Sequence, residues 1–212
     1  YRRLRATYGP AGWWPARTPF EVCLGAILTQ NTSWSNARKA LHELRRRGLL
    51  SFRRLDPLSV GELAPLIRSS GVFRVKARRV RAFLDFLGRE FQGRAGALRR
   101  AEGRSLRRLL LGVGGIGPET ADCIALYAAG KPFFVVDAYT RRIFARLGHL
   151  RGGESYDEVQ AFFGRALPKD AELFNDYHAQ IVRLAKEACR PRPLCASCPL
   201  DDVCAKVGVV RT

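Results

Sequence analysis

Residues 109–142 read LLLGVGGIGPETADCIALYAAGKPFFVVDAYTRR, and this stretch decides the fold. Its glycines follow the pattern G-x-G-x-x-G between Gly112 and Gly117, and Asp137 comes 20 residues after Gly117. This spacing matches a dinucleotide-binding turn, which requires a strand immediately before it. Ser105 to Leu111 instead has helical spacing with two internal arginines. We therefore reject a dinucleotide site.

The same glycines fit a helix–hairpin–helix, in which Gly115-Ile116-Gly117 forms the turn and Pro118 starts the second helix. Glycine permits a positive φ, and the N–H groups at a helix start can bind a phosphate. Ile116 should pack inward and hold the hairpin closed. The pattern therefore predicts phosphate contacts at Gly115, Ile116 and Gly117. A plain turn between two helices is the alternative.

The rest of the chain has helical periodicity. Capping signatures predict helix starts at Thr18-Pro19-Phe20-Glu21, at Ser59 with Glu62 and at Ser155 with Glu158. The segment Phe133 to Val136 has the character of a strand, but one strand alone makes no sheet. The sequence therefore predicts an all-α fold.

Composition limits the class of protein. The chain has 212 residues, enough for one large domain or two small ones, and at 47% hydrophobic it can bury a core. Its 37 Lys and Arg residues against 19 Asp and Glu give a net charge of +18, spread along the whole chain. Such an excess indicates a polyanionic partner, with a solvated basic surface as the alternative.

The sequence gives no sign of membrane insertion or export. It has no run of 18 apolar residues and no apolar stretch at its N-terminus. It also contains no Met, so we expect the true N-terminus to lie upstream. We expect a reducing compartment, the cytoplasm at the nucleoid, and no membrane partner.

Four of the six cysteines lie near the C-terminus, in the order Cys189-x5-Cys195-x2-Cys198-x5-Cys204. Four thiolates this close can bind one metal centre. A single close pair favours a [4Fe–4S] cluster over zinc, whose usual sites contain two such pairs. Zinc and a pair of disulfides are the alternatives. Cys23 and Cys123 lie in apolar helical runs and are expected in the core.

Asp137 follows the apolar run Phe133 to Val136 and precedes a predicted helix. An Asp at this position is a good N-cap. It can also be a partly buried carboxylate that faces DNA.

In this order, the hairpin, the aspartate and the four-cysteine loop resemble the endonuclease III-like DNA glycosylases of the helix–hairpin–helix–GPD superfamily. The resemblance implies a six-helix barrel of residues 18–130. It implies a second helical domain, residues 1–17 and 131–212, that carries the iron–sulfur cluster, with DNA across the cleft. Asp137 matches the essential aspartate of the family, and Arg141 is expected to contact DNA.

The chain departs from the family pattern at two places. Five residues separate the first two cysteines, where the family usually has six. Glu119 occupies the place of the lysine of bifunctional members, 18 residues before Asp137. A carboxylate cannot form the Schiff base that strand cleavage needs. The expected enzyme is therefore a monofunctional N-glycosylase of base excision repair, which leaves an abasic site and has weak or no lyase activity.

The segments around Trp13, Trp14 and Trp34 resemble the 3-methyladenine DNA glycosylase III branch, in which aromatic residues sandwich the flipped base. Tryptophan faces also favour a cationic alkylated base, by about 0.5–2 kcal/mol each. These tryptophans can instead be core residues. On this interpretation Asp137 stabilises the oxocarbenium-like sugar, and Glu119 either favours the cationic base or is simply exposed.

Base extrusion leaves a hole in the stack that an inserted side chain usually fills. By resemblance Gln30 fills it, and Val72 or Phe73 wedges the opposite strand. Gln30 can equally be a plain helix-end residue. The expected partner is double-stranded DNA with a damaged base, bound by a monomer. Three alternatives stay open: a glycosylase for oxidised pyrimidines or mismatched bases, a non-catalytic binder of DNA structures, and a zinc-stapled helical protein.

Overall fold

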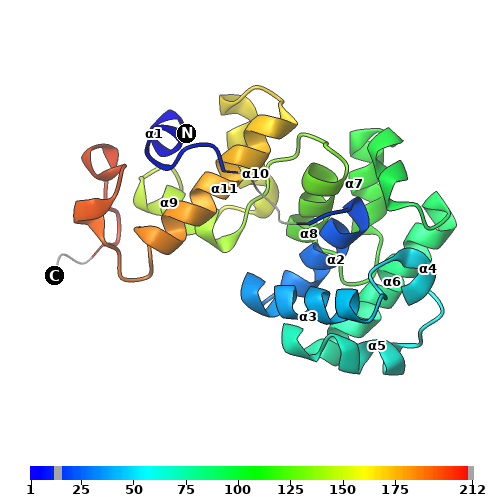
Figure 1. Cartoon of the computed structure of the whole chain (residues 1–212). Coiled ribbons are helices and arrows are strands. Elements are labelled where there is room, and N and C mark those ends of the chain that lie inside the picture. The colour runs from blue at the N-terminus through cyan, green and yellow to red at the C-terminus, as the bar shows by residue number, and fades with distance from the viewer. Residues whose placement is uncertain (12–15, 210–212) are drawn as a thin grey trace. The chain divides into compact units, whose positions relative to one another are not determined.

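The computed structural model describes residues 1–11 and 16–209, and the chain divides into two compact units (Figure 1). The central unit is Trp14–Lys131, and the terminal unit combines Tyr1–Trp13 with Pro132–Thr212. No strand occurs in the described residues, which confirms the all-α class. None of the helices in these ranges is long and apolar enough to cross a membrane.

The central unit consists of mostly short helices and one long one. They are α2 (Pro19–Thr29), α3 (Trp34–Arg46), α4 (Phe52–Leu55), α5 (Val60–Leu66), η1 (Arg68–Ser70), α6 (Phe73–Phe91), η2 (Ala95–Arg100), α7 (Gly103–Leu111), α8 (Pro118–Cys123) and η3 (Ile124–Ala128), which is a π-helix.

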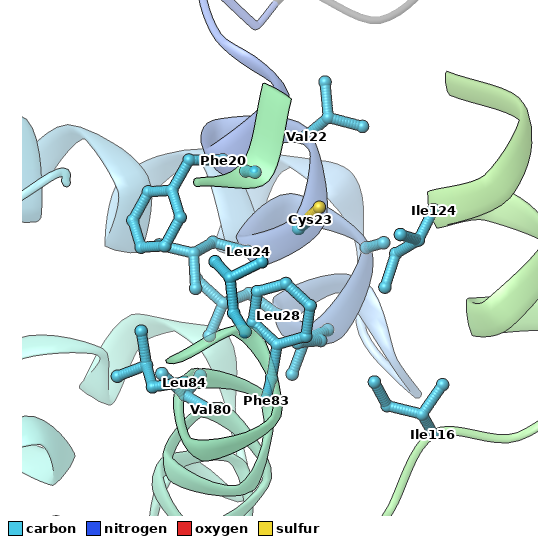
Figure 2. Packing of buried hydrophobic residues seen from close by; sticks show 14 of the residues in the cluster. Phe20, Val22, Cys23, Leu24, Leu28, Val80, Phe83, Leu84, Ile116 and Ile124 are labelled. Atoms are coloured by element: carbon cyan, nitrogen blue, oxygen red, sulfur yellow. The ribbon is translucent and has the colours of Figure 1, made fainter. Parts of the chain in front are cut away.

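Helix α2 forms the centre of the core of this unit. It is buried on every face, as expected for a helix enclosed by others, and Leu24 and Leu28 are fully buried. Figure 2 shows these leucines beside Val80 and Phe83 of α6. Ile116 is also buried, so its predicted inward packing is confirmed.

Local capping signals work as predicted at two helices and differ at a third. Ser59 with Glu62 and Ser155 with Glu158 form complete capping boxes. At α2, Thr18 caps the N–H of Glu21, but the Glu21 carboxylate accepts from the N–H of Arg17 and pairs with Arg45. Glu21 is only 2% exposed, and a buried carboxylate is stable only when it is paired.

The two cysteines outside the C-terminal loop differ in burial. Cys23 is fully buried in the core, as predicted. Cys123 is only half-buried and packs against the edge of that core.

The terminal unit packs its helices around an aromatic cluster. Its elements are α1 (Arg2–Tyr8), α9 (Ala138–Arg146), α10 (Tyr156–Ala166), α11 (Ala171–Glu187), η4 (Cys195–Ser197) and η5 (Asp201–Val203). Phe134 stacks on Phe163 of α10 with ring centroids 3.8 Å apart, and Phe163 meets Phe144 of α9 edge-on at 4.6 Å. These rings fix the chain that leads into α9.

The run Phe133 to Val136 is extended but forms no strand. Two of its backbone groups bind side chains of α10 instead of a neighbouring strand. Gln160 donates to the carbonyl of Phe134 at 2.7 Å, and the Tyr156 hydroxyl accepts from the N–H of Val136 at 3.3 Å. The β-character of this run therefore reflects its burial and not a sheet.

Candidate active site and cysteine loop

Asp137 is the N-cap of α9, as its position after the apolar run predicts. Its Oδ1 accepts from the backbone N–H of Thr140 at 2.7 Å and from the Thr140 hydroxyl at 2.9 Å. Its Oδ2 lies 3.4 Å from Nε2 of His178 on α11. These contacts hold the carboxylate in place. The side chain is 15% exposed, so it still reaches the surface of its unit.

These contacts decide the ionisation of Asp137. Burial opposes the charged form, but the His178 side chain and the hydrogen bonds from Thr140 outweigh it, and the pKa of the Asp137 carboxyl lies below its usual value. A carboxylate at a helix N-terminus also gains from the helix dipole. Asp137 is therefore an anion at neutral pH.

His178 is a site residue that the sequence did not reveal. It is 5% exposed and comes from a helix 41 positions further along the chain. The one available signal is its place beside the apolar stripe of α11, where a polar residue needs a partner. Nothing in the sequence identifies that partner as Asp137.

The glycine turn joins α7 to α8 as a hairpin. Gly115 has φ of 84°, and a Cβ there would lie 2.4 Å from Cγ of Arg79. Gly117 has φ of −89° and no atom within 4 Å of a Cβ, so its conformation does not require glycine. Helices α7 and α8 are braced by Arg107, whose Nε donates to the buried Asp122 carboxylate at 2.8 Å.

Gln30, the residue expected to fill the hole left by a flipped base, is bound to this hairpin. Its amide nitrogen donates to the carbonyl of Gly115 and to the hydroxyl of Thr120, both at 2.9 Å. Its amide oxygen accepts from Arg79 at 2.5 Å. Gln30 must exchange these partners before it can enter a base stack.

The loop between η1 and α6 presents an apolar tip with flanking cations. Val72 is 62% exposed, while Phe73 is half-buried. The guanidinium groups of Arg68 and Arg74 each lie 6.0 Å from the centre of the Phe73 ring. Of the two predicted wedge residues, Val72 is the more exposed.

The four C-terminal cysteines gather in one loop, and none forms a disulfide. Burial raises the pKa of the Cys198 thiol, and nearby Cys189, Cys204 and Cys195 raise it further. Arg146 of α9 donates to Cys189 Sγ at 3.3 Å. Across residues 1–11 and 16–209, no three His, Cys, Asp or Glu side chains form a ready-made metal site. The thiols are grouped without being arranged for coordination.

Comparison with known proteins identifies the family. The sequence model of one protein family, the HhH-GPD superfamily base excision DNA repair proteins, matches residues 24–169, more than half of the chain. The chain belongs to this superfamily. The structural resemblance inferred from the hairpin, Asp137 and the cysteine loop is thereby confirmed.

Several HhH-GPD proteins are similar over most of their length. A Methanocaldococcus jannaschii protein, named as a candidate DNA repair glycosylase, is 41% identical over 96% of this chain and 93% of its own. Endonuclease III of Thermotoga maritima is 30% identical over 88% of this chain and 82% of its own. The crystal structure of H. pylori 3-methyladenine DNA glycosylase bound to 1,N6-ethenoadenine is 29% identical, with a TM-score of 0.77 over 88% of this chain and 95% of that one.

The remaining predicted residues of this HhH-GPD protein fall in different settings. Glu119 is exposed in the first turn of α8. Trp34 opens α3, half-buried against the core of the central unit, whereas Trp13 and Trp14 lie outside the described residues. Arg141 donates to the backbone carbonyl of Glu154 at 2.8 Å, so part of its guanidinium is already engaged.

Proposed function

We propose that this DNA glycosylase of the HhH-GPD superfamily is monofunctional and removes alkylated bases from double-stranded DNA. The proposal depends above all on Asp137, which is an anchored and ionised carboxylate. It also depends on Glu119, which stands where bifunctional members carry a lysine. In this role Asp137 faces the sugar of the extruded nucleotide.

The proposed chemistry is hydrolysis of the N-glycosidic bond. As the C1′–N bond breaks, its electron pair leaves with the base and positive charge grows on the deoxyribose. The Asp137 carboxylate stabilises this charge, and water adds to C1′ and releases one proton to the solvent. An alkylated base is already cationic and departs neutral, so it needs no strong general acid. His178 keeps Asp137 ionised and fixes the direction of Oδ2.

The lysines of the chain favour the absence of lyase activity. The chain has six, and Glu119 stands at the matching position. Lys76 is fully buried, and its ammonium donates to backbone carbonyls of the central unit. An amine held in this way is not free to attack a sugar. We therefore expect borohydride to trap no covalent complex with DNA. Efficient trapping would show that another lysine has taken this role.

One comparison and one physical argument support an alkylated base. The similar H. pylori enzyme is named a 3-methyladenine DNA glycosylase, and its structure holds 1,N6-ethenoadenine. Tryptophan faces attract a cationic ring, and we assign Trp13, Trp14 and Trp34 to the base pocket.

Contacts with DNA are assigned to both units. We propose that Gly115, Ile116 and Gly117 bind a phosphate, that Gln30 enters the vacated stack and that Val72 wedges the opposite strand. Arg68 and Arg74 beside the Val72 tip supply charge for neighbouring phosphates. Arg141, in α9, adds a further contact with DNA.

We also propose that Cys189, Cys195, Cys198 and Cys204 hold a [4Fe–4S] cluster. Four gathered thiols are the ligand set that such a cluster takes, and the Arg146 N–H directed at Cys189 Sγ is typical of the hydrogen bonds cluster sulfurs receive. When bound, the cluster would crosslink a loop with little regular structure. A brown protein with iron and sulfide would support this assignment, and a colourless protein with stoichiometric zinc would overturn it.

The deciding experiment measures base release from duplexes with alkylated, oxidised or mismatched bases. We expect release from the alkylated duplexes and a loss of about 10²-fold or more in Asp137→Asn. Asparagine is an equally good N-cap, so folding and DNA affinity should be unchanged. Release that survives Asp137→Asn would refute the mechanism. Release from only the oxidised or mismatched duplexes would reassign the substrate, and release from none would favour a non-catalytic DNA binder.

A further inference from the structure

Lys76 is a buried cation at the start of α6. Its side chain is 0% exposed, although lysine is among the residues least often buried. Its Nζ donates to the backbone carbonyl of Leu28 at 2.8 Å and to that of Ser70. Burial and the nearby Arg79 lower the pKa of Lys76 to about 8, so the ammonium form still predominates at neutral pH. These two carbonyls offset the cost of burying the charge.

Both carbonyls come from places where a helix ends. Leu28 is next to the last residue of α2, so its carbonyl has no partner within the helix, and Ser70 is the last residue of η1. The C-terminal end of α2 also carries the negative end of its dipole, which favours a cation. An ammonium has three donors on one point, so it can bind carbonyls from two separate segments.

Each of these segments leads directly to a residue that the proposed function assigns to DNA. Gln30 comes two residues after Leu28, and Val72 comes two residues after Ser70. The two carbonyls accept from the same ammonium, so this ammonium fixes the distance between the two segments within the central unit. Arg79, one turn further along α6, holds the Gln30 side chain itself.

We propose that Lys76 is a positioning residue for base extrusion. Its ammonium holds the Gln30 segment and the Val72 loop in register, so that both side chains enter the duplex at the same base step. This inference depends on the proposed function, because only DNA insertion gives the spacing of the two segments a purpose.

If Lys76 only stabilises the fold, a different result is expected. Its removal would lower stability and slow base release equally from every substrate. A positioning residue matters only where a base must be pushed out of a pair and replaced. Its removal should therefore slow release from a paired lesion and spare release from a lesion that is already unpaired.

The test compares single-turnover release of an alkylated base from a fully paired duplex and from an unpaired bubble. Lys76→Met keeps the aliphatic volume and removes the donors. We expect release from the duplex to fall about 10- to 100-fold, as for a misplacement of about 1 Å, and release from the bubble to change by less than about threefold. Lys131→Met is the matched control, because Lys131 also donates to a backbone carbonyl, that of Arg99, at 2.9 Å. It should behave as wild type on both substrates.

Two results would overturn the proposal: no loss on either substrate, or an equal loss on both. If Lys76→Met does not fold, Lys76→Gln retains two N–H donors on a shorter side chain. We then expect a smaller loss with the same restriction to paired DNA, and an equal loss on both substrates counts against the role.

A separate readout distinguishes this proposal from the proposed function. If wild type releases no base from any substrate, the function fails, but insertion can still be followed by the fluorescence of 2-aminopurine placed in the opposite strand. We expect wild type to unstack the probe and Lys76→Met not to do so. Equal unstacking by the two proteins would refute the positioning role.

Discussion

At the scale of single residues, the behaviour of Asp137 depends on a histidine from a distant helix. Burial alone would raise the pKa of this carboxyl, and the His178 side chain and the Thr140 hydrogen bonds reverse that effect. The folded pKa lies below the unfolded one. The associated stability is therefore present above the unfolded pKa and is lost as the pH falls through the folded pKa.

Replacing His178 with Ala should move the acid limb of activity. The burial of Asp137 remains while an opposing contact is lost, so the pKa of Asp137 should rise, and the carboxylate should be protonated at a higher pH than in wild type. We expect kcat/KM to fall about tenfold on the acid side and much less at higher pH. The measurement is the pH profile of base release.

The exposed His42 provides the control, since His42→Ala should leave that profile unchanged. Superimposable acid limbs for wild type and His178→Ala would exclude the proposed coupling. A uniform loss at every pH would indicate damage to the fold instead.

The residues that could be predicted from sequence are those whose chemistry is local. Asp137 follows an apolar run and caps its own helix three residues away, so its place is visible in one short segment. His178 and Lys76 act through partners 41 and 48 positions distant. Such contacts depend on how helices pack, which periodicity does not specify. Gln30 could be predicted as a helix-end residue, but its attachment to the hairpin could not.

At the scale of elements, the hairpin between α7 and α8 contains glycines of unequal importance. Gly115 adopts a left-handed conformation, and a Cβ there would overlap the Arg79 side chain. Gly117 is extended, with free space around it. The sequence pattern treats the two alike, and only backbone geometry separates them.

Replacing Gly115 with Ala should therefore lower the free energy of unfolding by about 1–3 kcal/mol. Displacement of Arg79 should also release Gln30 and weaken the binding of undamaged duplex by about tenfold, because a phosphate contact is lost. Gly117→Ala, the matched control, should change stability by only about 0.5 kcal/mol. Thermal unfolding and DNA titration check both variants. Equal effects of the two substitutions would mean that the geometry of the turn is not what matters.

Helices could be predicted where a capping signature or an apolar stripe marks them. Prediction was poorer where neighbouring elements decide the backbone conformation. The capping boxes at Ser59 and Ser155 formed as expected. The run before Asp137 is not a strand, and two of its backbone groups bind α10 side chains. The π-helical turn of η3 extends α8 with widened spacing. No signal in the local sequence predicts this turn.

At the scale of the whole molecule, the net charge of +18 makes DNA binding an electrostatic process. Arginines that pair with acidic side chains contribute little to such binding, whereas those that flank an exposed tip remain available for phosphates. Arg68 and Arg74 lie beside Phe73 next to the exposed Val72, and Arg46 is paired with Glu43 on α3. For DNA binding, the location of the positive charges should therefore matter more than how many there are.

The affinity for undamaged duplex should fall linearly with salt on logarithmic axes, with a slope of about −0.9 for each phosphate neutralised. Exchanging both Arg68 and Arg74 for Gln should make that slope shallower by about 1 to 2, because counterions are no longer released at the wedge loop. Arg46→Gln should leave the slope unchanged, although it also removes a positive charge. Titrations between low and physiological salt measure all three proteins. A salt-independent wild type would contradict the electrostatic account, and an Arg46 effect equal to that of the loop arginines would show that only the total charge counts.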